Sequence, residues 1–93
     1  MTKVMIRTGD YGSAFYDCLN HAGDHDACII MSTLSNVLVE ACYRADKEPT
    51  EYSEGHVRID LSKADYPTIE VFRAVEGVIE QAARQYPEHI QIY

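Results

Sequence analysis

The sequence predicts an α+β domain of two layers, in which two helices pack on one face of a mainly antiparallel sheet. Two long segments, 27–45 and 67–86, repeat apolar residues at helical spacing. A pair of short segments with alternating polar and apolar residues precedes each of them, and one more short segment ends the chain. The order is therefore ββα-ββα-β. With 93 residues the chain has room for a single domain, 1–93, and one core.

The first half of the chain is expected to form a hairpin followed by a helix. Alternation at 3–7 and at 13–19 predicts two strands joined by a glycine-containing turn. Residues 20–26 form a polar loop, and Asp26 is the expected N-cap of the helix at 27–45, because its carboxylate can accept a first-turn N–H. The apolar stripe of this helix consists of Ala27, Ile30, Met31, Leu34, Leu38, Ala41, Cys42 and Ala45.

The second half repeats the arrangement. A short strand at 50–53 and an alternating strand at 56–61 predict a second hairpin. Asp65 or Thr68 is expected to cap the helix at 67–86. A last strand is expected at 89–93. The apolar stripe of the second helix consists of Val71, Phe72, Val75, Val78, Ile79, Ala82 and Tyr86.

Composition narrows the range of partners. The chain carries a formal net charge of -7, and its eight Lys and Arg residues are scattered, so nucleic acid is not an expected partner. An acidic surface attracts positively charged polypeptides, or simply keeps the protein soluble. No segment approaches the roughly 20 apolar residues of a membrane span, and none resembles a signal peptide. Three cysteines, an odd number, favour free thiols in a reducing cytoplasm over a secreted disulfide framework.

The candidate chemistry lies where the polar loop meets the first helix. If Asp26 caps the helix, Cys28 is its second residue and lies off the apolar stripe, where the helix dipole favours thiolate over thiol. His21 is then a candidate general base, and Asp26 and Ser32 are candidate supporting residues. Structural interpretations remain open for each. Cys28 can be a small core residue, His21 a solvated loop histidine and Asp26 only a cap, while the Ser32 hydroxyl can bond back to a carbonyl one turn earlier.

A metal site is an alternative use of the same segment. Cys18, His21, His25 and Cys28 are four possible zinc ligands within eleven residues. The pattern lacks the paired Cys-x-x-Cys knuckles of structural zinc sites, and the predicted core does not need a metal. Zinc therefore stays a minor alternative, and no cofactor is expected.

These residues resemble a motif of the ribosomal-processing cysteine proteases of bacteria and some of their phages. That family has Gly-His-Ala at the end of a strand, a mobile loop, then Asp and a helix that begins Cys-Ala-Ala-Val-Ser-Ala-Leu. This chain has Asn20-His21-Ala22, then Asp26, then 28–34 with its cysteine, serine and leucine in step. The order of strands and helices agrees over nearly the whole length. The chain departs from the family in a shorter loop and in the bulky Ile29 and Ile30 beside the thiol.

The resemblance implies a function and an assembly. By it, Cys28 is the nucleophile, His21 the base, and Asp26 and Ser32 supporting residues. Backbone N–H groups near Cys28 and Ile29 would hold the oxyanion. The family is homodimeric and removes an N-terminal extension from a large-subunit ribosomal protein, and phage structural proteins are processed similarly. The expected partner is therefore a protein or peptide substrate. The shorter loop leaves open an inactive binding or adaptor protein of the same fold.

Overall fold

The chain folds in the predicted order ββα-ββα-β, in a computed structural model that describes residues 1–93. The strands alternate polar and apolar side chains and the helices repeat them every three to four residues, as the sequence indicated. The elements are β1 (Thr2–Thr8), β2 (Ala14–Leu19), α1 (His25–Arg44), β3 (Glu51–Ser53), β4 (His56–Leu61), α2 (Tyr66–Gln85) and β5 (Ile90–Ile92). Neither helix combines the length and the apolar character that spanning a membrane requires.

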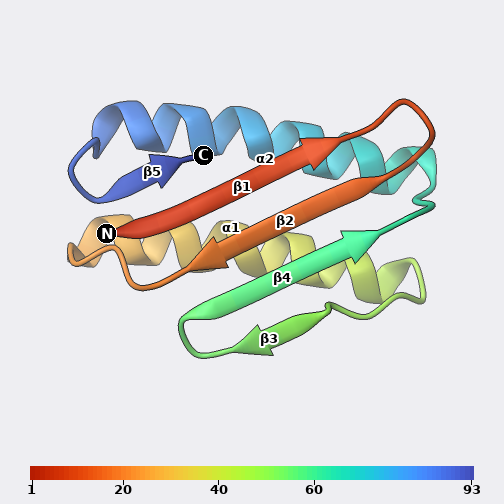
Figure 1. Cartoon of the computed structure of the whole chain (residues 1–93), viewed down its shortest axis with the longest axis horizontal. Helices are drawn as coiled ribbons and strands as arrows, with labels where there is room; N and C mark the ends of the chain where they lie inside the picture. The colour runs from red at the N-terminus through yellow and green to blue at the C-terminus, as the bar shows by residue number, and fades with distance from the viewer.

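The five strands form one sheet in the order β3-β4-β2-β1-β5. The pairs β1–β2, β2–β4 and β3–β4 are antiparallel, and only β5 lies parallel to its neighbour β1. Both helices lie behind this sheet in Figure 1, so one face of the sheet is covered and the other is open. The predicted α+β class, with two helices on one face of a mainly antiparallel sheet, is confirmed.

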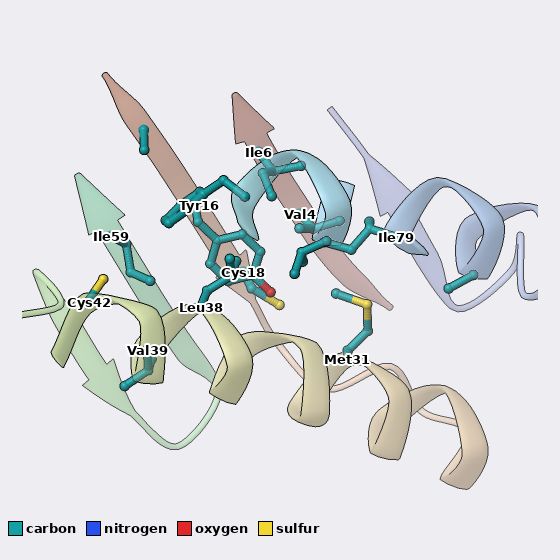
Figure 2. Packing of buried hydrophobic residues seen from close by; sticks show 14 of the residues in the cluster. Val4, Ile6, Tyr16, Cys18, Met31, Leu38, Val39, Cys42, Ile59 and Ile79 are labelled. Atoms are coloured by element: carbon teal, nitrogen blue, oxygen red, sulfur yellow. The ribbon is translucent and has the colours of Figure 1, made fainter. Parts of the chain in front are cut away.

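The core lies between the sheet and the helices. Val4 and Ile6 of β1 and Tyr16 of β2 alternate with outward residues and point towards the helical layer (Figure 2). Leu38 of α1 and Phe72 of α2, both fully buried, meet them there. Every buried polar side-chain atom has a hydrogen-bond partner, so the core carries no uncompensated polar burial.

The predicted start of the first helix is wrong by two residues. α1 begins at His25 and its N-cap is Asp24, whose Oδ2 accepts the Ala27 N–H at 3.1 Å. Gly23 precedes the cap with a φ of 82° and turns the chain into the helix two residues earlier than expected. Asp26 therefore lies inside the first turn. The cap of α2 is Asp65, one of the two predicted candidates.

The buried faces of the helices also differ in part from the predicted stripes. In α1, Ser35 and Val39 are buried, whereas Leu34 and Ala41 are only half-buried. The Ser35 hydroxyl can be buried because the Tyr16 hydroxyl lies 2.6 Å from it. In α2, Val78 is 44% exposed, so it lies outside the buried stripe.

Candidate functional site

A cavity of about 230 Å³ opens between α1 and the β3–β4 hairpin, beside the end of β2. His21, Cys28 and Ser32, three of the predicted site residues, all line it. Asp26 does not line it and is exposed in the first turn of α1. The structure thus brings the predicted base and the predicted nucleophile to one cavity and leaves Asp26 outside.

The residue before His21 is anchored to two other segments. Asn20 has a φ of 72°, which asparagine tolerates better than most residues, and it turns the chain out of β2. Its N–H donates to the Gly55 carbonyl at 2.8 Å, and its own carbonyl accepts the Thr2 hydroxyl at 3.0 Å. The chain therefore turns sharply at Asn20, and this turn is held from β1 and from the hairpin.

The imidazole of His21 lies at the hairpin side of the cavity. Its Nε2 is 3.9 Å from Glu54 Oε1, and a Cβ added to Gly55 would lie 3.9 Å from the same nitrogen. The side chain is 67% exposed, so water reaches it. Glu54, at the tip of the hairpin, is a neighbour of the candidate base that sequence spacing did not indicate.

Cys28 lies at the fourth position of α1, half-buried, with its side chain packed against the core. Its N–H donates to the Asp24 carbonyl at 2.9 Å, the first hydrogen bond of the helical ladder. That N–H is therefore occupied, and the expectation that it would hold an oxyanion is wrong. The error follows from the cap, because a helix that began two residues later would have left this N–H free.

The wall opposite Cys28 comes from residues that the sequence analysis did not single out. Tyr52 of β3 crosses to α1, where its hydroxyl donates to Asn36 Oδ1 at 2.9 Å. Both residues line the cavity, as does Ser32, one turn after Cys28. Asn36 follows Cys28 and Ser32 at four-residue spacing on α1. No spacing rule could have indicated Tyr52, because it meets α1 only after β3 and β4 join the sheet.

The other two cysteines belong to the core. Cys18 and Cys42 are buried free thiols, and burial raises the pKa of each. Cys18 also lines the cavity. No group of three His, Cys, Asp or Glu side chains is arranged to hold a metal ion. The residues of the alternative zinc site, Cys18, His21, His25 and Cys28, form no such group.

A second polar cluster lies on the open face of the sheet. Asp17 alternates with the inward Tyr16 and Cys18, so its side chain faces away from the helices. Its carboxylate lies 2.8 Å from His56 Nε2 and accepts the Tyr93 hydroxyl at 3.1 Å. Burial and this hydrogen bond raise the pKa of Tyr93. The His56 imidazole is therefore held by Asp17, although His56 also lines the cavity.

Solved structures share this fold over nearly the whole chain. The ribosomal processing protease Prp from S. aureus, with a covalently linked product peptide, matches with a TM-score of 0.79 and 20% sequence identity. The match covers 99% of this chain and 97% of that protease. The fold is that of Prp.

Two further comparisons agree with the Prp fold. Prp with a substrate peptide matches at a TM-score of 0.65 and 20% identity, over 100% of this chain and 98% of the other. SMU.848 from Streptococcus mutans matches at 0.77 and 27% identity, over 99% of this chain and 91% of its own. No protein-family model and no curated protein match the sequence. The Prp fold is thus built here from a sequence that shares only 20% identity with Prp.

Proposed function

We propose that this protein is a small cysteine protease of the ribosomal-processing type, which cleaves an N-terminal extension from a ribosomal or phage structural protein. One observation carries the proposal: Cys28 and His21 line one cavity in a fold shared with Prp, a protease crystallised with substrate and product peptides. Fold alone does not assign an activity, so the argument rests on this pair of side chains.

In the proposed reaction His21 takes the thiol proton of Cys28, and the thiolate attacks the scissile carbonyl carbon. The C–N bond of the tetrahedral intermediate breaks as His21 returns the proton to the leaving amine. Water, deprotonated by His21, then hydrolyses the thioester, and the Cys28 thiol is regenerated. The histidine and the thiol must approach to hydrogen-bond distance for these transfers, and such contacts often tighten only when substrate binds.

The oxyanion needs donors other than the Cys28 N–H, which is already bonded to Asp24. Side chains that line the cavity offer them: the Ser32 hydroxyl and the Asn20 amide. Asp26 lies outside the cavity lining. We therefore assign it only a supporting role, in which its negative charge stabilises the first turn of α1.

We also propose that the enzyme acts as a homodimer in a reducing cytoplasm. Its three cysteines are free thiols, which suits that compartment. Sedimentation velocity at micromolar concentration tests the dimer, and a monomer at every concentration would contradict it.

The test of the thiolate pair is the pH dependence of iodoacetamide alkylation, resolved for each cysteine by peptide mass spectrometry. Cys28 should react fast well below the unperturbed thiol pKa of about 8.5. Cys18 and Cys42, whose pKa values are raised by burial, are internal controls and should stay slow. His21→Ala should abolish the fast reaction at Cys28, whereas the control His25→Ala, which changes an exposed residue outside the cavity, should not.

Peptide cleavage should depend on Cys28 in the same way. Peptides digested by the wild-type protein should stay intact with Cys28→Ala, and circular dichroism should show an unchanged fold. Cleavage by that variant would refute the protease. The rival function, an inactive binding protein of this fold, is favoured by the high exposure of His21 and its approach to Glu54. Ordinary reactivity at Cys28 in the wild-type protein would establish the rival.

A further inference from the structure

The loop that carries His21 is held by a residue from the far end of the chain. His89, in the turn before β5, lies 67 residues from Ala22, and its Nδ1 is 3.0 Å from the Ala22 carbonyl oxygen. A carbonyl can only accept a hydrogen bond, so Nδ1 carries the proton and donates it. In Figure 1 this turn, the start of β1 and the loop after β2 gather at one end of the molecule.

His89 is itself firmly placed. Its N–H donates to the Tyr86 carbonyl at 3.0 Å, and its carbonyl accepts the Thr2 N–H at 2.8 Å. The Thr2 hydroxyl in turn bonds the Asn20 carbonyl. A ring of hydrogen bonds therefore joins the end of α2, the start of β1 and the loop, and His89 closes it at Ala22.

His21 lies between the two anchored residues of this ring. Asn20 is held at both its N–H and its carbonyl, and Ala22 is 1% exposed with its carbonyl bonded to His89. The exposed His21 side chain thus projects from a backbone that is restrained on either side. Loss of the hydrogen bond at Ala22 would release the backbone on the C-terminal side of His21, because the next residue is the flexible Gly23, with a φ of 82°.

We propose that His89 is a positioning residue for the Cys28–His21 pair: its Nδ1–H holds the Ala22 carbonyl and so sets where the His21 imidazole lies relative to the thiol. The inference rests on the proposed function of that pair. His89 does not line the cavity, so it acts through the loop and does not touch the substrate.

Two substitutions separate positioning from mere packing. In His89→Asn the side-chain NH₂ falls near the place of Nδ1 and can still donate to Ala22. In His89→Gln the NH₂ falls near Nε2 and cannot. The measurement is the rate of Cys28 alkylation across pH 5 to 9. His89→Gln should slow the reaction below pH 7 by about tenfold or more, since small displacements of a reacting pair are costly. His89→Asn should stay within about twofold of the wild-type rate.

Alkylation of each cysteine, resolved by peptide mass spectrometry of the same samples, also tests the other possible roles of His89. If His89 only stabilises the fold, both variants should expose Cys18 and Cys42 to alkylation alike, and Cys28 would not be singled out; that result overturns the proposal. A wild-type rate in His89→Gln also overturns it, while His21→Ala still shows the thiolate pair to be real. If the wild-type Cys28 is itself unreactive, the proposed function fails first and the positioning role falls with it.

Discussion

A hydrogen bond between the hydroxyl groups of Tyr16 and Ser35 joins β2 to α1 inside the core. The two hydroxyl oxygens are 2.6 Å apart, Tyr16 is 0% exposed and Ser35 is 5% exposed. Burial raises the pKa of Tyr16, so the phenol stays protonated and the pair stays neutral. Removal of one hydroxyl leaves the other buried without this partner.

Each single substitution should therefore cost more than the bond itself contributes. Tyr16→Phe and Ser35→Ala are each expected to lower the free energy of unfolding by about 2 kcal/mol, the penalty of an unpaired buried hydroxyl. For a domain of this length that corresponds to a fall of roughly 10 °C in Tm.

The double variant is the decisive measurement. Loss of both hydroxyls leaves no unpaired group, so its cost should be smaller than the sum of the single costs by about 1 to 2 kcal/mol. Urea unfolding followed by circular dichroism at 222 nm gives these energies. Tyr52→Phe is the matched control, because its hydroxyl bonds Asn36 at the surface, and it should stay within about 0.5 kcal/mol. Additive single costs, or a control as costly as Tyr16→Phe, would refute the reasoning.

Three further predictions follow from caps, burial and packing. Asp24→Ala should lower the free energy of unfolding by about 1 kcal/mol and Asp26→Ala by only a few tenths, because Asp24 is the N-cap of α1. Equal losses in urea unfolding would mean that Asp24 is not the N-cap. Burial raises the thiol pKa values of Cys18 and Cys42 in the folded state, so the unfolded chain loses these protons first. The contribution of these two thiols to stability should then be constant below about pH 8.5 and should be lost as the pH rises above it. A flat profile from pH 7.5 to 9.5 would contradict this. Phe72→Ala, at a position with 0% exposure, should cost about 3 to 5 kcal/mol by urea unfolding, and a loss below about 1 kcal/mol would mean that the site collapses.

Local patterns predicted most of the elements. The alternation at 3–7 and 56–61 and the helical repeat at 27–45 are properties of neighbouring residues, and all three correspond to observed elements. The first cap could not be chosen in this way. Asp24 and Asp26 are chemically identical two residues apart, and the decision depended on where the turn at Gly23 left the chain.

The residues of the candidate site also fall into two groups, those that local sequence predicted and those that it did not. His21, Cys28 and Ser32 lie close together in the sequence, and the structure places all three at one cavity. The opposite wall, with Tyr52 and Glu54, comes from the second hairpin. That hairpin reaches the site because β4 pairs with β2, at a separation of more than 35 residues. Such pairings depend on loop closure and on the fit of whole strands, which short-range periodicity does not encode.

The sequence by itself determined the number, type and order of the helices and strands, since these follow from side-chain periodicity and backbone preference. Only the tertiary structure decided the strand order, the parallel partner of β5 and the hydrogen bond from His89 to the loop beside His21. The physical reason is distance along the chain. Residues tens of positions apart meet only when the burial of one core and the completion of one sheet select a single arrangement among many.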